Sequence, residues 1–525
     1  MDKQEYLTLG TARDLARWQD RALYRAGEML PGILAWLTLI GVVVLSFRHP
    51  VAISIFIIIF DVYWLTKTMY LTLHLRASFR KVRTNMKVQW AERLEKLALN
   101  EYQLANLSDW RELYHLIILP TYKESVELIV ASVESLAAAD YPKNRMLVVL
   151  AQEQRAGVEH NHAIAEAIST RFTGQFFELL ITEHPASIIG EQAGKGANCA
   201  FAAKIAQRTI IDRLEIPHQR VLVSSFDVDT VVYPGYFACL TYTFLTARNP
   251  LRASYQPIPF FINNIWEAPA FARVVSFAST FWQIIQQERP ENLITFSSHS
   301  MPLTALIDIG YWQVNMVSED SRVFWQCLLR YDGDYRVVPM YFPVSMDANA
   351  APTFWQTMLN VYKQHRRWGY GTENVPYFLF GFIKNRAMPL KRKLFYTITI
   401  LEGYWSWATN AIILFLLGWL PLIVGGPAFY QTIISFNLPV LTRTISGLAL
   451  IGLVTSAMLS IAVLPPRPPQ YGRYRHIMMV LQWLLFPLTT ILLGAIPGLE
   501  AQTRLMLGKY MGFWVTPKYR KEYNK

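Results

Sequence analysis

Long apolar runs crowd both ends of the chain, whereas the stretch between about residues 100 and 385 alternates polar and apolar segments. Two runs near the start, residues 30–47 and 51–75, are each long enough to cross a hydrocarbon core of about 30 Å. The alternating stretch is typical of a water-soluble domain. The pattern therefore predicts one soluble domain between two groups of membrane helices. The C-terminal candidate spans are residues 397–417, 445–464 and 477–496.

The stretch of residues 420–441 is ambiguous, because it is apolar but contains a Gly-Gly-Pro sequence at residues 425–427. It can be a fourth C-terminal span, a re-entrant piece or an outer loop. The sequence thus predicts three or four C-terminal spans within residues 394–500. An amphipathic basic tail follows at residues 501–525, and it can lie in the membrane interface or pack on the soluble domain beside an active site.

The soluble part has the period of alternating strands and helices. A strand, a helix and a second strand in succession form a βαβ unit. The series predicts a mostly parallel sheet with helices on its faces, in which ligands bind at the carboxyl ends of the strands. Strands are expected at residues 114–119, 146–150, 220–225 and 335–340, and helices at residues 126–139, 194–211, 234–246 and 322–329.

The composition agrees with this division. Of 525 residues, 52% are hydrophobic and only 17% are charged, whereas soluble proteins have about 25% charged residues. A chain of this length also exceeds what one hydrophobic core usually holds. An integral membrane protein with lipid as a partner is expected. Cys199, Cys239 and Cys327 are too few and too scattered for a disulfide framework, which fits a reducing compartment.

The basic residues indicate the orientation. The net charge of +12 would suit nucleic-acid binding, but Lys and Arg cluster beside the apolar runs, at residues 76–87 and 384–393. The positive-inside rule assigns such flanks to the cytoplasm. The sequence therefore predicts a cytoplasmic N-terminal segment (residues 1–29), a transmembrane hairpin (residues 30–75) and a cytoplasmic domain (residues 76–393) at the cytoplasmic membrane, with no nucleic-acid partner.

Asp227 and Asp229 stand directly after the expected strand of residues 220–225. Side chains two apart on an extended chain point the same way, so both carboxylates face one spot. Such a pair can hold Mg²⁺ or Mn²⁺ together with diphosphate oxygens, since these ions prefer oxygen ligands. A second acidic pair, in the Asp-Gly-Asp sequence of residues 332–334, is explained by a turn and serves as an internal control.

Two further segments contain candidate functional residues that also have an ordinary structural explanation. Lys195 stands in a Gly-Lys-Gly loop that opens a helix, where it can bind phosphate or remain a solvated surface lysine. Asp320 follows Ser318 and Glu319. It is either a general base for an acceptor hydroxyl or part of an acidic first turn capped by Ser318.

Gln364, Arg367 and Trp368 precede the third apolar run, and therefore lie near the membrane surface. The indole can be an interfacial anchor, with the arginine reaching for lipid phosphate. Equally, the indole can stack on a sugar ring while the guanidinium binds a leaving diphosphate. Both interpretations stay open at this point.

The order of these segments is more specific than any one of them. Pro-Thr-Tyr-Lys-Glu at residues 120–124, Gly-Lys-Gly, Asp-Val-Asp, Ser-Glu-Asp and Gln-x-x-Arg-Trp follow one another between about residues 114 and 371. In series and spacing they resemble the membrane-bound family 2 glycosyltransferases, such as cellulose synthase and hyaluronan synthase. The resemblance implies an α/β nucleotide-sugar-binding domain of the GT-A type, inserted between N-terminal and C-terminal transmembrane helices. It also implies inverting transfer from a nucleotide sugar, such as a UDP-sugar, to a saccharide or lipid-linked acceptor.

The resemblance also assigns roles by position. Asp320 would be the catalytic base, and Asp227 and Asp229 would bind Mg²⁺ or Mn²⁺. The substrate-binding positions would be Tyr122 and Glu124 beside the nucleotide, Lys195 and Asp227 at its diphosphate, Glu319 next to the base, and Gln364, Arg367 and Trp368 at the acceptor end and the diphosphate.

The chain departs from the family pattern in two places. Relatives usually end the second strand with two Asp residues that contact the base and ribose, whereas here Ala-Gln-Glu follows, and Glu153 is expected to substitute. The nucleotide therefore stays open. Relatives commonly have a Gly/Thr-rich segment before the catalytic acid. This chain has Ser-Ser-His-Ser at residues 297–300, where His299 is either an acceptor contact or a packing residue.

Several functions fit this pattern. Gln-x-x-Arg-Trp favours processive extension of a polysaccharide, and single transfer to a polyprenyl phosphate or another lipid is the alternative. Outside the enzyme class, the chain could be a transporter or a decayed nucleotide-sugar-binding regulator. A transporter would normally have more spans and internal repeats, and a decayed site would be expected to have lost one of its acids.

Overall fold

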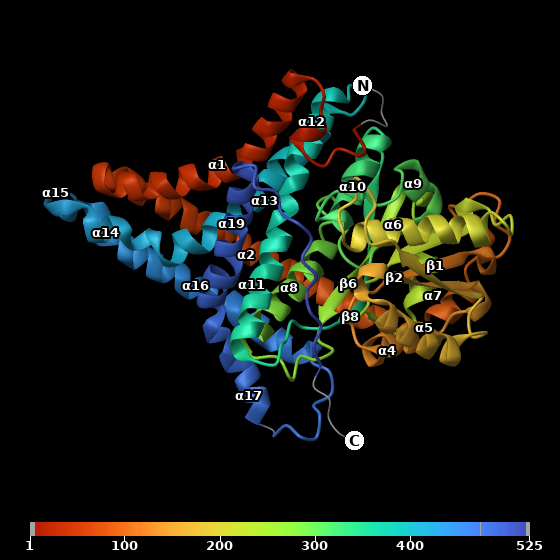
Figure 1. Cartoon of the computed structure of the whole chain (residues 1–525). Helices are drawn as coiled ribbons and strands as arrows, with labels where there is room; N and C mark the ends of the chain where they lie inside the picture. The colour runs from red at the N-terminus through yellow and green to blue at the C-terminus, as the bar shows by residue number, and fades with distance from the viewer. Residues whose placement is uncertain (1–5, 473, 521–525) are drawn as a thin grey trace.

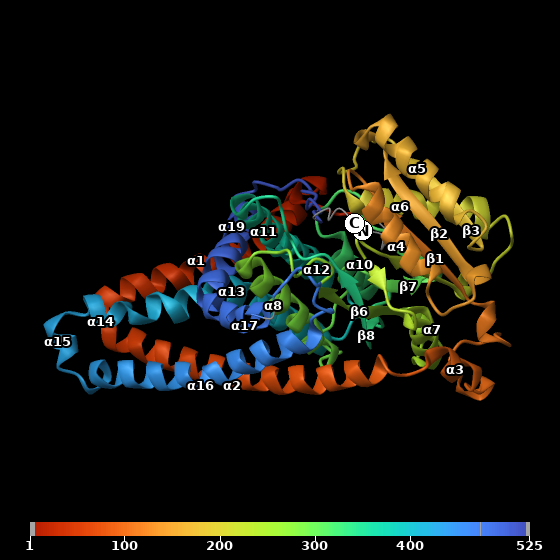
Figure 2. The same cartoon turned by 90° about the horizontal axis from the view of Figure 1, so that it is seen from below.

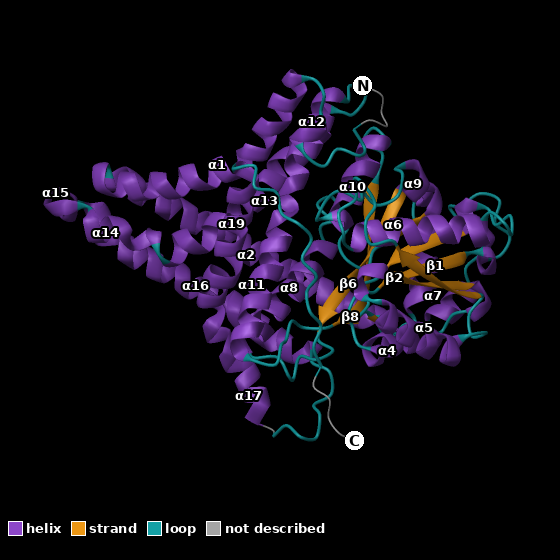
Figure 3. Cartoon of the chain, viewed as in Figure 1, coloured by secondary structure: helices purple, strands orange, loops and turns teal. Residues whose placement is uncertain are grey.

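The computed structural model describes residues 6–472 and 474–520. It consists of an α/β domain beside a group of long helices (Figure 1). The strands are confined to the α/β domain (Figure 3). The chain enters and leaves through the helical group, so the domain is an insertion between helices, as its hydropathy pattern predicts.

The long helices occupy both ends of the chain, and α2 and α16 pack along one another (Figure 2). Within the described residues, four helical runs are long and apolar enough to cross a membrane: Trp18–Arg48, Pro50–Asn85, Ile433–Val463 and Tyr474–Met506. A fifth is added if Leu390–Phe415 and Leu417–Val424, which meet at a 49° bend, are one broken span. The helices of this group are α1 (Trp18–Arg48), α2 (Pro50–Asn85), α13 (Leu390–Phe415), α14 (Leu420–Val424), α15 (Gly426–Tyr430), α16 (Ile433–Val463), α17 (Tyr474–Leu481), α18 (Phe486–Thr490) and α19 (Ile496–Met506).

An eight-stranded sheet forms the centre of the α/β domain, in the order β3-β2-β1-β4-β7-β6-β8-β5. Its first four strands run parallel, and β6 runs parallel to β8. The short β7 is antiparallel to both of its neighbours, and β5 is antiparallel to β8, so the sheet is mixed rather than mostly parallel. The strands are β1 (Tyr114–Pro120), β2 (Met146–Glu153), β3 (Glu178–His184), β4 (Val221–Ser225), β5 (Val231–Val232), β6 (Ala253–Phe261), β7 (Ser300–Pro302) and β8 (Arg336–Met346).

Helices cover both faces of the sheet, because alternate side chains of each strand point to opposite sides. On β1, Leu116 and Ile118 belong to the core shared with α6 and α10, whereas Ile117 and Leu119 belong to the core shared with α4 and α7. The domain helices are α3 (Trp90–Glu95), α4 (Val126–Ala137), α5 (Val158–Phe172), α6 (Lys195–Ala206), α7 (Tyr236–Thr246), α8 (Ala270–Gln287), α9 (Leu303–Asp308), α10 (Glu319–Arg330), α11 (Phe354–Gly369) and α12 (Asn374–Lys384).

Both ends of the chain pack on the α/β domain. Near the start, Leu7 and Leu9 are buried in its core, and the buried Arg322 of α10 donates a hydrogen bond of 2.9 Å to the carbonyl oxygen of Leu9. After α19, residues 507–520 run as an extended segment between the helical group and the domain (Figure 1). Of the two positions open to the basic tail, its described part therefore takes the one on the domain.

Candidate functional site

Three charged side chains from distant parts of the sequence meet where β4 ends. Lys195, the first residue of α6, donates from Nζ to Asp227 Oδ1 at 2.7 Å. The same ammonium group donates to both carboxylate oxygens of Asp320, at 3.1 and 3.0 Å. Lys195 therefore bridges the Asp-Val-Asp and Ser-Glu-Asp motifs, which are far apart in the sequence.

The glycines on either side of Lys195 are explained by close contacts. A Cβ atom on Gly196 would lie 2.9 Å from Cβ of Glu319, and one on Gly194 would lie 2.7 Å from Cγ of Phe513. A larger residue at either position would force its neighbour away. The Gly-Lys-Gly loop thus lets α10 on one side and the tail on the other approach the lysine.

Two cations stabilise the negative charge of Asp227. Burial acts to raise its pKa, but the ammonium groups of Lys195 and Lys518 outweigh burial and hold the pKa well below its usual range. Asp227 therefore stays ionised throughout the neutral range. The pKa of Lys195 is raised well above its usual value, because the surrounding carboxylates outweigh its own burial.

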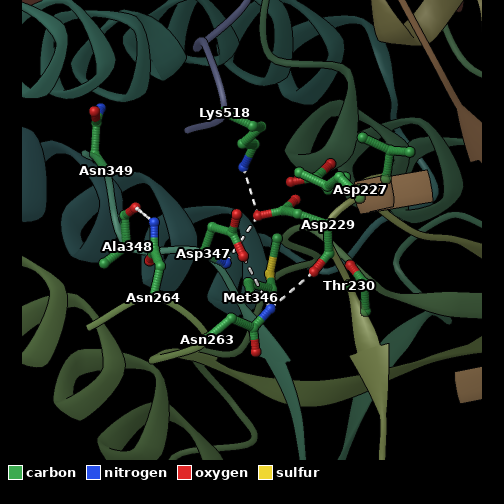
Figure 4. A network of polar contacts seen from close by, with 12 residues as sticks. Asp227, Asp229, Thr230, Asn263, Asn264, Met346, Asp347, Ala348, Asn349 and Lys518 are labelled. Atoms are coloured by element: carbon green, nitrogen blue, oxygen red, sulfur yellow. Dashed lines mark hydrogen bonds and ion pairs between the residues drawn. The ribbon is translucent and has the colours of Figure 1, made fainter. Parts of the chain in front are cut away.

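Asp229 is fully buried, and its environment is drawn in Figure 4. Its Oδ2 accepts hydrogen bonds from Lys518 Nζ at 2.7 Å and from the backbone N–H of Asp347 at 2.8 Å. Its Oδ1 has no hydrogen-bond partner among the residues that the structure describes. Burial and the charge of Asp229 raise the pKa of Asp347, whose carboxylate is bound by Arg520.

This arrangement partly fits a divalent metal ion. In the described part of the chain, no group of three or more His, Cys, Asp or Glu side chains could hold a metal. Asp227 and Asp229 nevertheless supply hard oxygen ligands, and the buried, unpartnered Oδ1 of Asp229 has the character of an open ligand position. The remaining ligands would have to come from a diphosphate or from water.

The segment that carries Asp320 is held by hydrogen bonds to the buried Glu373 rather than by a capping bond from the Ser318 side chain. Ser318 makes no side-chain capping bond to α10. Instead, Glu373 Oε1 accepts hydrogen bonds from the backbone N–H groups of Val317 at 3.1 Å and Ser318 at 2.8 Å, and from Ser318 Oγ at 2.7 Å. Glu373 ends η9 (Tyr370–Glu373), which directly follows α11. It therefore ties the Ser-Glu-Asp segment to the Gln-x-x-Arg-Trp helix.

Two titratable groups flank Asp320. Burial, followed by the charge of Asp320, raises the pKa of Glu319 to about 8, so this carboxyl is largely protonated at neutral pH. His299 is fully buried, with Nδ1 at 2.9 Å from the carbonyl oxygen of Phe296 and 3.9 Å from Asp320 Oδ1. Burial lowers its pKa, so the ring is neutral. Its Nε2 has no partner among the described residues.

The residues expected beside the nucleotide lie at the ends of β1 and β2. Arg155 pairs with Glu153 and places its guanidinium 4.2 Å from the centre of the Tyr122 ring. Glu124 accepts a hydrogen bond of 2.7 Å from the Tyr122 backbone N–H. Burial raises the pKa of Glu124. A half-buried aromatic and charged surface therefore lies at the positions where the motif resemblance implies the nucleotide, and it includes Arg155, which the sequence motifs did not indicate.

The Gln-x-x-Arg-Trp side chains all belong to α11, on the side of the site next to the helical group. Trp368 packs between aromatic rings, with ring centres 6.1 Å from Phe261 and 6.0 Å from Phe296. Arg367 lies over the ring of Phe513, at 4.9 Å. Gln364 accepts a hydrogen bond from Asn349 and lines a small pocket together with Trp368, Asp347 and Asn349. The helix thus borders both the acids and the tail.

The tail covers this site from the end of α19 to residue 520. Beyond its contact with Arg367, Phe513 lies against Gly194, and Trp514 is 5.5 Å from the ammonium group of Lys363. Lys518 then reaches Asp229. No motif or period in the sequence indicated Asp347 or the contacts of Glu373 and Lys518.

Comparisons with known proteins agree with the motif pattern. No protein-family profile matches the chain. The chain is similar to the poly-β-1,6-N-acetyl-D-glucosamine synthases of Staphylococcus aureus strains COL and N315, with 33% identity over 88 residues in each case. These residues are 17% of this chain and 19% of each relative, so the chain matches about a fifth of the length of these relatives.

Two solved glycosyltransferase structures are weakly similar to the chain. A mannosyltransferase of Pyrobaculum calidifontis in complex with GDP-Man and Mn²⁺ is 15% identical, with a TM-score of 0.40 over 75% of this chain and 99% of that one. Staphylococcus aureus TarS, residues 1–349 with UDP-GlcNAc, is 10% identical, with a TM-score of 0.36 over 68% and 93% of the two chains.

The assembled motifs, the mixed sheet and the apolar helices at both ends point to one class of protein. It resembles the family 2 glycosyltransferases, and its mixed α/β domain, set between helices that are apolar enough to span a membrane, fits a GT-A-type domain. The similarity to a polysaccharide synthase bears out the resemblance that the order of motifs indicated.

Proposed function

We propose that the protein is an inverting glycosyltransferase that moves a sugar from a nucleotide sugar to an acceptor hydroxyl at the membrane surface. The observation that carries this proposal is the contact of one ammonium group, that of Lys195, with both Asp227 and Asp320. A cation placed between Asp227, which can bind a diphosphate through a metal ion, and the carboxylate of Asp320 suits a reaction in which an anion leaves while a hydroxyl loses its proton.

The reaction is a single displacement. Asp320 takes the proton of the acceptor hydroxyl, whose oxygen forms a bond to the anomeric carbon of the sugar. The bond from that carbon to the diphosphate oxygen breaks, and the nucleoside diphosphate leaves with the electron pair. Lys195 and Arg367 supply positive charge on the side where negative charge develops. Preorganised charge of this kind is usually the largest contribution to catalysis, and loss of one such group costs about 10²–10³ in turnover.

We also propose that a divalent cation, Mg²⁺ or Mn²⁺, binds with the substrate. Asp227 and Asp229 would hold it, and the unpartnered Oδ1 of Asp229 supports this assignment. When bound, the ion would neutralise the diphosphate. Lys518 competes for the same carboxylate, so binding of the ion would require Lys518 to move from Asp229 Oδ2 or to remain on that oxygen alone.

We propose a UDP-sugar as the donor and a growing polysaccharide as the acceptor. The polysaccharide acceptor is supported by the name of the curated relatives, which are polysaccharide synthases. Arg155 over Tyr122 offers hydrogen-bond donors to the oxygens of a pyrimidine base. Transfer of one sugar to a polyprenyl phosphate or another lipid is the alternative acceptor chemistry. The basic flanks of the apolar runs support a cytoplasmic domain.

The test is release of nucleoside diphosphate by the purified full chain in lipid nanodiscs. A panel of UDP- and GDP-sugars is offered with Mn²⁺ or Mg²⁺ and an extract of membrane saccharides and lipids as acceptor. Release from one sugar nucleotide above all others is expected, and the size of the labelled product separates polymer from single transfer. Failure to release diphosphate from any donor would overturn the proposal.

A further inference from the structure

A basic cluster lies at the membrane edge of the α/β domain, on elements that carry none of the proposed catalytic residues. It consists of Arg273 near the start of α8 and Arg475 near the start of α17, with the aromatic side chains of Trp266, Tyr471 and His476 around them. We refer to these five residues as the Arg273 cluster. It is not explained by the glycosyl transfer proposed above.

Among the residues that the structure describes, the buried cation Arg273 has no acidic partner. Only 4% of the residue is exposed. Its Nε donates to Gln482 Oε1 at 2.6 Å and its Nη1 donates to the carbonyl oxygen of Ala268 at 2.8 Å. Among the described residues, no carboxylate lies within ion-pair distance of its guanidinium. Neutral oxygens alone thus hold a charge whose burial normally requires an anion.

A second cation adds to the positive charge around Arg273. Arg475 is half-buried and close enough that, after burial itself, it is the main cause that lowers the pKa of Arg273, to about 10. Arg475 lies over the ring of Tyr471, at 4.8 Å. Gln482, which is also buried, has an Nε2 with no partner among the described residues. Two guanidinium groups and a free amide donor therefore lie close together, and in the described part of the chain only neutral oxygens accept from Arg273.

The surroundings favour an anion that belongs to the membrane. Trp266 and Tyr471 stack with ring centres 6.2 Å apart and an interplanar angle of 23°, and His476 packs against the edge of the same indole. Aromatic rings beside arginines are typical of the head-group level of a bilayer. The apolar run Tyr474–Met506 begins at this point, so the cluster stands where a span leaves the membrane.

We propose that the Arg273 cluster binds the phosphate of an anionic membrane lipid. The phosphate oxygens would accept hydrogen bonds from the guanidinium groups of Arg273 and Arg475, in the planar geometry that suits arginine and phosphate. Gln482 Nε2 supplies a further donor. Trp266 and Tyr471 flank the glycerol region of the lipid.

The test compares the purified full chain in nanodiscs of phosphatidylcholine with the same chain in nanodiscs that contain equal amounts of phosphatidylcholine and phosphatidylglycerol. The readout is the midpoint temperature of unfolding, because a ligand that binds the folded state raises it. Phosphatidylglycerol is expected to raise the midpoint of the wild-type chain by a few degrees. Arg475→Gln should lose this increment, and because Arg475 is only half-buried, the variant is expected to fold.

Arg386→Gln is the matched control, since it removes the same charge from an exposed position in the basic flank before α13. This control should keep the increment. The proposal is overturned if Arg475→Gln keeps the full increment, or if Arg386→Gln loses as much of it. It is also overturned if inorganic phosphate in phosphatidylcholine nanodiscs gives the same rise, because the site would then bind free phosphate. The readout is independent of sugar transfer, so failure here leaves the proposed function untouched.

Discussion

Lys518 donates a hydrogen bond of 2.7 Å from Nζ to Asp229 Oδ2, a residue that lies 289 positions earlier in the chain. Because Asp229 is fully buried, its negative charge would be costly without this ammonium group. Two residues further on, Arg520 binds Asp347 in the same region. The end of the described chain is therefore part of the electrostatic balance of the site.

Replacing Lys518 should show that the stability of the protein depends on this ammonium group. Lys518→Met is expected to lower the free energy of unfolding in the presence of a chelator by about 3 kcal/mol, since it leaves a buried carboxylate unpaired. Added Mn²⁺ should restore much of this loss if Asp229 is a metal ligand. Chemical denaturation with and without the ion provides the measurement. Lys509→Met, at an exposed position of the same tail, is the control. Equal stability of the two variants would contradict this role of Lys518.

Glu319 predicts a specific pH dependence of stability. Its pKa is raised from 4.5 to about 8 in the folded protein, so folding favours its protonated form. Its contribution to stability is therefore complete below the unfolded pKa and is lost as the pH rises from about 4.5 to about 8. Glu319→Gln cannot ionise, so its midpoint of thermal unfolding should fall less over this range than that of the wild type. Glu134→Gln, on the surface of α4, should follow the wild-type curve. A Glu319→Gln curve parallel to the wild type would refute the shifted pKa.

Glu373 is expected to act as a positioning residue for Asp320. Glu373→Gln replaces an acceptor of three hydrogen bonds with a side chain that has one poorer acceptor. A displacement of the base by about 1 Å can reduce turnover about 10²-fold, so kcat should fall while KM for the nucleotide sugar changes little. Steady-state kinetics measures both. Ser318→Ala, which removes one of the three bonds, should show a smaller effect in the same direction. An unchanged kcat in Glu373→Gln would exclude the role.

The side of the membrane on which the domain lies can be tested with a single reactive thiol. The three native cysteines are buried, whereas Ile189 is fully exposed on the domain. Ile189→Cys should react with a membrane-impermeant maleimide in inverted vesicles and not in intact cells, because the basic flanks predict a cytoplasmic domain. Val158→Cys, at another exposed position, should behave identically. Labelling of both variants in intact cells would place the domain outside.

Much of the fold could be predicted because its signals are local. The strand of residues 114–119 and the helix of residues 126–139 match β1 and α4 to within about two residues, since hydrophobic period and turn residues define them. The antiparallel β7 could not be predicted, because its three residues have no recognisable period. The sheet was therefore expected to be more parallel than it is.

In the site, too, the residues marked by local sequence patterns could be predicted, whereas those positioned by distant contacts could not. Asp227 could be singled out because it follows a strand, and Asp320 because of its place in the series of motifs. Glu373 and Lys518 act through partners more than fifty residues away in the sequence. No pattern along the chain reports such a contact. Arg155 lies two residues from Glu153, yet its position over Tyr122 depends on the pairing of β1 with β2.

The most direct measurement is diphosphate release from the preferred nucleotide sugar by Asp320→Asn beside Asp334→Asn, which changes an acid in the exposed turn of residues 332–334. Asp320→Asn should lose at least about 10²-fold in turnover and still bind the donor, because only the proton acceptor is removed. Asp334→Asn should retain wild-type turnover. Normal release by Asp320→Asn would show that this carboxylate is not the catalytic base. The contact of Lys195 with Asp227 and Asp320 would then have another role.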